Sequence, residues 1–210
     1  MDSSTPASGN SAPTVRRRTG GRSARVRAQV VEAVGALLLE AGYDGLTVDA
    51  VAERADVHRT TVYRRWRDVG GLLADVLDAA ADDTWQPADT GTLEGDLTAL
   101  NQELYEALSS GPTLTTALIA ASFRSAEAAA ALSRFWEDRY ERCAVVVARA
   151  AARGEVPAET APRALLVAAT APLYHELLLL RTAPDPALPD RAARAAAAAA
   201  RTGAFAAAAG

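Results

Sequence analysis

The chain has 210 residues, half of them hydrophobic, and a net charge of −4, which excludes disorder throughout because this much apolar side chain can form a packed core. Its single cysteine, Cys143, excludes an intrachain disulfide, and its two histidines stand 117 positions apart, so we expect no metal and no other cofactor. No apolar run approaches the roughly 20 residues that span a bilayer, and the basic amino terminus lacks the apolar segment of a secretory signal, so we expect a cytoplasmic protein without a membrane partner.

Residues 1–21 are predicted to form a disordered basic arm, because they mix Ser, Thr, Pro, Gly and Arg without apolar periodicity. Arg16 to Arg18, Arg22 and Arg25 could add phosphate or minor-groove contacts, or the arm could serve only as an unstructured, solubilising terminus. A helix is predicted over 23–41, where valines and leucines recur at spacings of three and four until Gly42 stops the pattern.

Two short helices are predicted next, over 47–54 and 58–65. Thr47 is placed to cap the first, because its side-chain oxygen can accept a hydrogen bond from an otherwise unpaired backbone amide. Only three or four residues separate the helices, so they must cross steeply. This geometry is a helix-turn-helix, and residues 22–67 are predicted to be a three-helix DNA-binding domain.

The second short helix is predicted to have one apolar and one polar side. At about 100° per residue, Val62 and Trp66 fall together and pack inward. The opposite side carries hydrogen-bond donors, which match the acceptors of bases and phosphates in the major groove of B-DNA. The residues on or flanking this side are Arg59, Thr60, Thr61, Tyr63, Arg64 and Arg65.

A charged face that only meets solvent is the alternative for this helix. The distribution of charge favours DNA. Residues 1–67 contain 11 arginines and 7 acidic residues, a net charge of +4, whereas residues 68–210 contain 11 arginines and 19 acidic residues, a net charge of −8. The two parts of the chain therefore face different partners.

The rest of the chain is predicted to be helical, because no strand-like alternation occurs. Asp68 is a candidate cap for a helix that reaches about Asp83, and a loop follows to Gly91. Further helices are expected over 92–109, 112–123, 125–153 and 158–181. The alanine-rich segment 187–208 could form a last helix or a frayed tail. The predicted fold class is all-α.

The segment from Thr47 to Trp66 resembles the DNA-binding segment of the tetracycline-repressor (TetR) family of one-component transcriptional regulators. The resemblance is carried by Thr47, Val51-Ala52, Ala55, Val57, Val62-Tyr63 and Trp66. Its specific part covers residues 23–83, and the remainder agrees only in length and in being helical. Three departures are Asp56 in place of a common glycine, His58 in place of a common serine, and Gly70-Gly71 in place of lysine and an acid. The glycines remove one expected phosphate contact and are predicted to loosen the start of their helix.

The resemblance implies a double-stranded DNA operator as partner. By position in the motif, Arg59, Thr60 and Tyr63 approach bases or nearby backbone, while Thr47, Thr61 and Arg65 hold phosphates; Arg64 is a further candidate. It also implies a homodimer, joined through 158–181 and 187–208 by leucines with alanines that allow close approach. The leucines expected there are Leu165, Leu166, Leu173 and Leu177 to Leu180. Two copies would bind a palindrome.

The resemblance further implies that residues 68–210 form an effector-binding and dimerisation domain, in which a small molecule of unknown identity moves the helix after Asp68 and opposes DNA binding. The candidate lining residues are Trp85, Tyr105, Phe123, Trp136, Arg139, Tyr140, Tyr174 and His175. Ordinary core packing is the alternative for each, and a satisfied buried histidine is the alternative for His175. Cys143 is expected to be a buried packing residue rather than a redox sensor.

Together these features predict a transcriptional regulator, expected to repress, that binds a palindromic operator as a homodimer and is released by a ligand. An activator, or a regulator without an effector, is the alternative within this class. An enzyme is disfavoured because GxSxG, HExxH and a phosphate-binding glycine loop are all missing. A helical adaptor would not need the donor-covered face.

Overall fold

The computed structural model describes residues 20–81 and 84–206. In these ranges the chain forms α-helices and one π-helical turn, and its only extended pairing is an isolated bridge between Thr160 and Ala206. The all-α class is therefore confirmed. The elements are α1 Gly20–Gly45, α2 Val48–Arg54, α3 Arg59–Trp66, α4 Val69–Ala81, α5 Leu93–Ser109, α6 Leu114–Ser122, α7 Ala126–Ala152, α8 Pro162–Tyr174, the π-helix η1 His175–Leu180 and α9 Leu188–Arg201.

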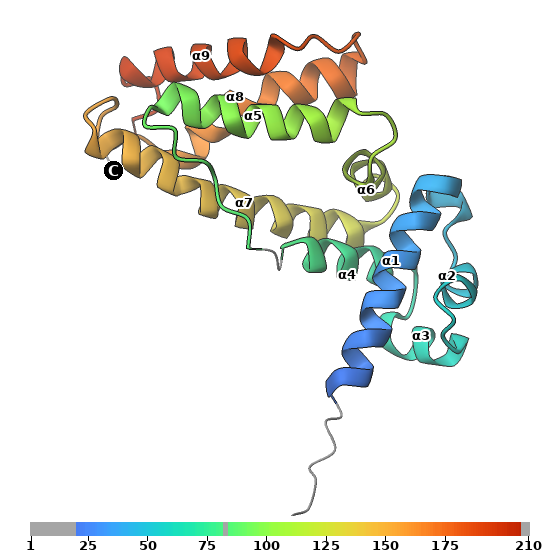
Figure 1. Cartoon of the computed structure of the whole chain (residues 1–210). Helices are drawn as coiled ribbons and strands as arrows, with labels where there is room; N and C mark the ends of the chain where they lie inside the picture. The colour runs from blue at the N-terminus through green and yellow to red at the C-terminus, as the bar shows by residue number, and fades with distance from the viewer. Residues whose placement is uncertain (1–19, 82–83, 207–210) are drawn as a thin grey trace, which may run out of the picture.

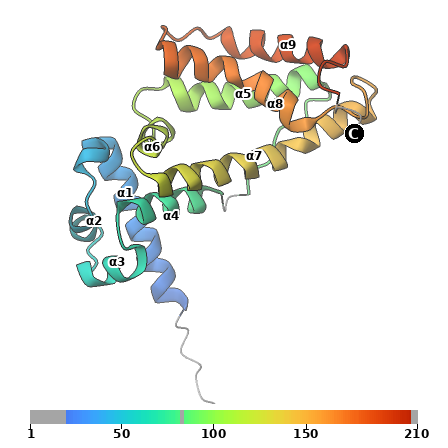
Figure 2. The ribbon, with the colours of Figure 1, turned by 180° about the vertical axis from the view of Figure 1, so that it is seen from behind.

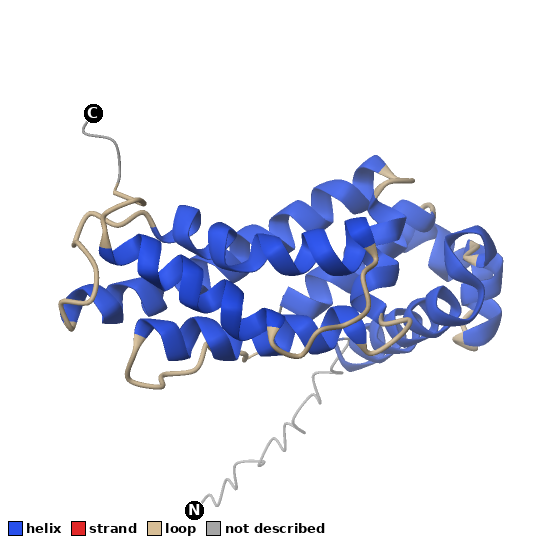
Figure 3. Cartoon of the chain, turned by 90° about the horizontal axis from the view of Figure 1, so that it is seen from above, coloured by secondary structure: helices blue, strands red, loops and turns tan. Residues whose placement is uncertain are grey.

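The helices form two groups along an elongated molecule (Figure 1). Helices α1 to α3 pack together at one end of the molecule, and α4 leads from them along α7. Helices α5, α8 and α9 form a layer on the other side of α7, as the view from behind also shows (Figure 2). Seen from above, the described chain consists of helices joined by loops, and no strand is drawn in it (Figure 3).

One hydrophobic core joins the first helices to the rest of the molecule. It contains Val34 of α1, Val51 of α2 and Val62 of α3, and it continues through Leu73 of α4 to Ala131 of α7. Each of these side chains is buried. Helix α4 therefore shares packing with both groups of helices, and a displacement of α4 must be felt by α3.

A second core lies among α5, α7, α8 and α9, and it explains why the alanine-rich segment is helical rather than frayed. Seven side chains of α9 are buried, five of them alanines, so the helix can approach α5 and α8 closely. Asn101 of α5 is fully buried there, and its side-chain amide donates to the carbonyl oxygens of Ala169 (3.0 Å) and Pro189 (3.2 Å). These two hydrogen bonds fix the relative positions of all three helices.

Several predicted boundaries were wrong. Helix α1 begins at Gly20, so the last two residues of the predicted arm are helical; the rest of the arm, 1–19, lies outside the described residues. Helix α8 begins only at Pro162, because proline suits the first turn of a helix. Helix α9 ends at Arg201, where Gly203 takes a φ of 78° and the chain turns so that the Ala161 amide donates to the carbonyl of Phe205 at 2.7 Å.

The apolar stretch Pro162–Leu180 also corrects the sequence analysis. Its 19 residues have a mean hydropathy of 1.3, so by length and composition they could cross a membrane. Leu165, Leu166 and Leu173 are nevertheless fully buried, and α8 packs against α5, α7 and α9. These three leucines therefore face the helical bundle, whereas most of the stretch is not buried within this chain.

The paired glycines at the start of α4 permit a close approach. A Cβ atom on Gly71 would lie 2.2 Å from the carbonyl oxygen of Trp66, and one on Gly70 would lie 2.9 Å from the Ser125 hydroxyl. The helix start is also capped, because the Asp68 carboxylate accepts from the Gly71 amide at 3.0 Å. The glycines thus let α4 begin directly against the end of α3 rather than loosening it.

We predict that Gly71→Ala lowers the free energy of unfolding by about 1–3 kcal/mol, because the new methyl group overpacks a backbone contact that cannot move alone. Gly21→Ala is the matched control, since a Cβ at Gly21 meets no atom within 4 Å. That change should be neutral or stabilising by up to about 1 kcal/mol, from the higher helix propensity of alanine. Urea denaturation of both variants measures the difference, and equal stabilities would disprove the close-approach role.

Candidate DNA-binding surface and effector cavity

Local backbone chemistry builds the turn between α2 and α3. The Thr47 side chain caps α2 by accepting from the Ala50 amide at 3.1 Å, as predicted. Asp56 has a φ of 51°, the left-handed conformation that its short polar side chain tolerates. His58 caps α3, since its Nδ1 lies 3.4 Å from the Thr60 amide and 2.9 Å from the Thr60 hydroxyl. Both departures from the common motif therefore keep the turn intact.

Helix α3 has the two predicted sides. Val62 and Trp66 are buried at 0% and 5% exposure, which fixes the helix on the core. Arg59, Thr60 and Tyr63 are exposed on the other side, and Tyr63 retains 45% of its surface although it is a large aromatic residue. An exposed polar face with an aromatic residue on a firmly packed helix is the arrangement that major-groove recognition needs.

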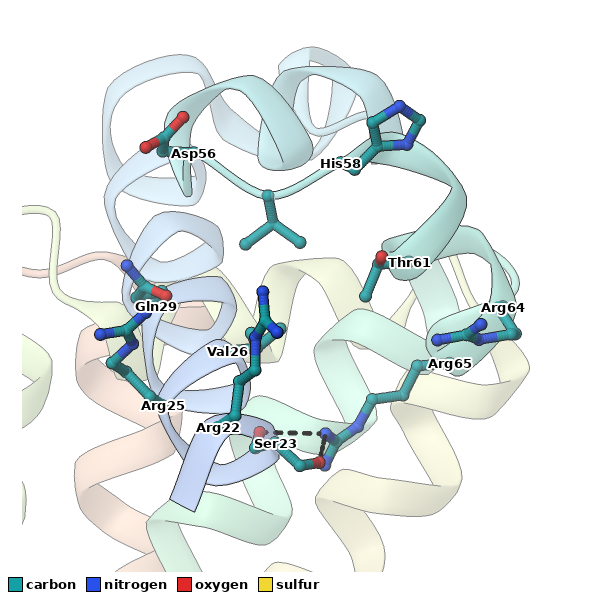
Figure 4. A pocket seen from close by; sticks show the side chains of 11 residues that line it. Arg22, Ser23, Arg25, Val26, Gln29, Asp56, His58, Thr61, Arg64 and Arg65 are labelled. Carbon is teal, nitrogen blue, oxygen red and sulfur yellow. Dashed lines mark hydrogen bonds between the residues drawn. The ribbon is translucent and has the colours of Figure 1, made fainter. Parts of the chain in front are cut away.

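A groove of about 840 Å³ separates α3 from the start of α1 (Figure 4). Its four arginines are Arg22 and Arg25 of α1 and Arg64 and Arg65 of α3. Figure 4 shows Arg22 reaching from α1 toward the groove and Arg64 lying along the α3 side. So many guanidinium groups around one open hollow create a site that attracts phosphate groups.

Two residues that were expected to contact DNA, Thr61 and Arg65, also line this groove. Thr61 is half-buried on its wall. Arg65 donates to the hydroxyl of Ser23 at 3.0 Å and to its carbonyl at 3.3 Å, and its guanidinium lies 4.9 Å from the Trp66 ring centre. In the described structure Arg65 thus joins α3 to α1. Arg59 lies 4.0 Å from the Asp49 carboxylate, a distance that leaves it available for another partner.

Asp75 of α4 connects three helices. Its carboxylate accepts from Nε1 of Trp66 in α3 at 2.8 Å and from Nε of Arg27 in α1 at 2.8 Å. We call this arrangement the Asp75 clasp. Asp75 lies about one helical turn after Gly71, so α4 is joined to the end of α3 at two successive points.

A cavity of about 250 Å³ lies between α5, α7 and α8, with Trp85 at one side. Its lining is mainly aromatic and apolar, with a few polar groups. The lining residues are Trp85, Leu100, Glu103, Leu104, Ala107, Thr115, Phe135, Trp136, Arg139, Tyr140, Cys143, Leu166, Thr170 and Tyr174. An apolar pocket with few polar groups is the usual form of a small-molecule site.

The cavity is linked to the far end of α4. Arg139, on its wall, donates to the carbonyl of Ala80 at 3.4 Å, and Arg142 donates to the carbonyl of Ala81 and is ion-paired with Asp138 at 2.9 Å. These carbonyls end α4, so positive charge at this point is also favourable to the helix dipole. The cavity wall therefore contacts the C-terminal end of α4, and the Asp75 clasp holds the middle of the same helix.

Comparison with known proteins agrees with this architecture in both halves of the chain. Residues 31–76 match the family model for bacterial regulatory proteins of the tetR family, and residues 87–196, more than half of the chain, match the model for a tetracyclin repressor-like C-terminal domain. The chain belongs to the TetR family. It is a helix-turn-helix transcriptional regulator that binds DNA, and it is not an enzyme.

Curated relatives and solved structures support the same family. This TetR-family chain is 33% identical to the HTH-type transcriptional regulator AqdR of Rhodococcus erythropolis over 73% of the chain and 74% of that protein. It is 33% identical to the DNA-binding transcriptional repressor TetR of Mycobacteroides abscessus over 68% of the chain and 77% of that protein. The crystal structure of the TetR family transcription regulator SCO0332 superposes with a TM-score of 0.65 at 28% identity, covering 83% of this chain and 97% of that one.

The structure of this TetR-family regulator gathers five of the eight predicted effector residues around the cavity, namely Trp85, Trp136, Arg139, Tyr140 and Tyr174. It does not place the other three there. Phe123 is 83% exposed as the C-cap of α6. Tyr105 packs with Leu173 in a separate cluster. His175 is exposed on η1. It does not line the cavity, and it is not the buried histidine of the alternative interpretation.

Sequence reasoning missed other cavity residues, chiefly Glu103, Phe135 and the apolar residues of α5. Phe135 directly precedes Trp136 on α7, and both side chains line the cavity. Cys143, predicted as a packing residue, is buried at 3% exposure, and burial raises the pKa of its thiol to about 11. The groove between α1 and α3 was also missed, although Arg22 and Arg25 had been singled out as basic. Nothing in the spacing of α1 alone shows that it faces α3.

Proposed function

We propose that this TetR-family protein is a cytoplasmic repressor that binds a palindromic operator as a homodimer and is released from it by a small molecule bound in the cavity. The observation that carries the proposal is the exposed polar face of α3, held by the buried Val62 and Trp66. Arg59, Thr60, Tyr63 and Arg64 are exposed on this helix. They supply the donors that read base edges and phosphates.

The proposed dimer uses α8 and α9 of each chain. The leucines expected at the interface do not all qualify, because Leu165, Leu166 and Leu173 are fully buried within one chain. The outer sides of the two helices instead carry small exposed side chains, Ala164 and Ala171 on α8 and Ala195 and Ala198 on α9. Such residues let helices of two chains approach closely. Leu179 and Leu180 of η1, 73% and 56% exposed, extend this surface with apolar area.

The proposed release acts through α4. A ligand in the cavity would contact Arg139, which donates to the Ala80 carbonyl at the end of α4. Any shift of α4 along α7 is passed through the Asp75 clasp to Trp66 and thus to α3. The two recognition helices of a dimer must sit about 34 Å apart, one turn of B-DNA. Changing that separation weakens operator binding and gives a coupling of about 1–3 kcal/mol between ligand and DNA.

Selection of binding sites from random DNA with the purified protein tests the proposal. We expect a two-fold symmetric consensus with half-site centres about 10 base pairs apart or a multiple of that spacing. Light scattering of the protein–DNA complex should give a mass that corresponds to two chains per site. Placing the selected site over a promoter in a transcription assay then tests repression. A single unsymmetrical half-site bound by one chain, or no enrichment, would contradict the proposal.

A further inference from the structure

The cavity wall is built largely from aromatic rings with ordered orientations. Trp136 meets Phe135 at a centroid distance of 5.1 Å and an interplanar angle of 76°, and it meets Tyr174 at 5.8 Å and 86°. Trp85 and Tyr140 complete the aromatic part of the lining. Because the neighbours of Trp136 stand nearly perpendicular to it, a flat molecule can stack on one ring while its edges meet the faces of the others.

The charged groups of the wall are held by contacts within the protein. The Glu103 carboxylate accepts from Nε1 of Trp85 at 2.8 Å. The Arg139 guanidinium lies 4.6 Å from the Trp85 ring centre and 5.1 Å from that of Phe135, and it donates to the Ala80 carbonyl. A charged ligand would have to give up its own hydration and disturb these contacts, so the wall favours an uncharged one.

Polar groups on the α8 side can serve a single hydrogen-bonding substituent. Burial raises the pKa of the Tyr174 phenol well above its ordinary value and also raises that of Tyr140, so both hydroxyls keep their protons and remain donors at neutral pH. The Thr170 hydroxyl donates to the Leu166 carbonyl at 3.0 Å, and its side chain is hydrogen-bonded to the Tyr140 phenol. One end of the cavity therefore offers the Tyr174 hydroxyl as a donor, beside the Tyr140 phenol oxygen, which can accept.

The volume limits the size of the occupant. The cavity measures about 250 Å³, which is below the range of roughly 300–1,000 Å³ that drug-sized ligands use. Two fused rings with a small substituent fit this space.

We propose that the effector of this regulator is an uncharged, planar aromatic compound of about two fused rings with one hydroxyl or carbonyl group, stacked on Trp136 with its polar group toward α8. The proposal rests on the proposed effector function of the cavity. It adds the chemical class of the ligand and the residues that select it.

Calorimetric titration of the full-length protein with three probes tests the proposal. The first two, 2-naphthol and decahydro-2-naphthol, share a carbon skeleton and a hydroxyl group but differ in aromaticity and flatness. The third, decanoate, is a charged chain of the same carbon number. We expect 2-naphthol to bind at least about tenfold more tightly than either of the others, which is the size of effect that a few aromatic contacts produce.

A pair of aromatic-to-leucine variants checks where the preference arises. Trp136→Leu removes the central ring and should abolish the preference for 2-naphthol. Phe123→Leu makes the same kind of change at a residue that is 83% exposed and absent from the cavity lining, and should leave the preference intact. Circular dichroism shows whether each variant is folded. If Trp136→Leu does not fold, the comparison of probes on the unaltered protein still decides the matter.

Equal affinities for 2-naphthol and decahydro-2-naphthol, tighter binding of decanoate, or no binding of 2-naphthol up to its solubility limit would each overturn the proposal. The titrations contain no DNA. A protein that binds 2-naphthol selectively but selects no symmetric operator would contradict the proposed function alone. A protein that binds its operator but treats the three probes alike would contradict only the aromatic effector.

Discussion

The double variant Arg59→Ala, Tyr63→Ala is expected to bind the selected operator about 100-fold or more weakly than the unaltered protein. Both side chains are exposed on the polar face of α3, and a well-placed base contact of this kind is worth about 1–3 kcal/mol. Because a dimer presents each residue twice, the loss is counted on both half-sites. Fold stability should change little, since the Arg59 contact to Asp49 is a long surface pair at 4.0 Å. Gel shift at fixed salt measures the loss, and circular dichroism measures helicity.

Arg134→Ala on α7 is the matched control for this variant. Arg134 is an exposed arginine paired with Asp78 at 3.4 Å, and it lies on neither α3 nor the proposed dimer helices α8 and α9. Its removal changes the net charge by the same amount as Arg59→Ala. Operator affinity should therefore stay within about threefold of the original, because a distant surface charge acts only through a screened field. An unchanged gel shift for the double variant would mean that α3 does not read the operator.

The helix-turn-helix could be predicted from sequence because its geometry depends on neighbouring residues. Thr47 caps α2 three residues before Ala50, Asp56 tolerates a left-handed turn, and Val62 with Trp66 sits one helical turn apart. Each of these features is set within four positions of the chain. The pattern therefore carries nearly all the information that this part of the fold needs.

Contacts between segments that are distant in the chain could not be predicted from the sequence pattern. Helical spacing shows which residues share one face, but it does not show which other helix covers that face. Asp75 meets Arg27, which is 48 positions away, and the groove brings Ser23 to Arg65, which is 42 positions away. The glycines of α4 looked like a weak helix start because the backbone they approach, at Trp66, cannot be recognised from spacing.

The effector cavity shows the same limit more clearly. Trp136 and Tyr140 share a face of α7 and both line the cavity. Phe123 was chosen for being aromatic, yet it caps the end of α6 and points to solvent. A residue at the end of a helix does not belong to a repeating apolar face, so the helical spacing does not show whether it points to the core or to solvent. Its environment depends on the loop that follows. Aromatic character selects candidates, and only the packing of α5, α7 and α8 decides among them.

Asp75→Ala is expected to lower the free energy of unfolding by about 2–3 kcal/mol and to weaken operator binding as well. Removing the carboxylate leaves Nε1 of Trp66 and the guanidinium of Arg27 without their acceptor, and hydrogen bonds to a charged group are each worth about 1.5–3 kcal/mol. The Asp75 and Arg27 side chains are 19% and 31% exposed, so water replaces part of this loss. Urea denaturation gives the stability, and gel shift gives the affinity.

Asp78→Ala separates the clasp from the general effect of removing a carboxylate from α4. Asp78 lies almost one turn further along the helix and pairs with Arg134 at 3.4 Å, with side chains 53% and 60% exposed. An exposed pair of this kind contributes about 0–1 kcal/mol, so its loss should hardly alter stability. If Asp75→Ala and Asp78→Ala behaved alike, the clasp would have no special part in joining α4 to the recognition helix. If only Asp75→Ala weakens operator binding, α4 positions α3 through a single carboxylate, and a ligand that shifts α4 has a direct route to the DNA-binding face.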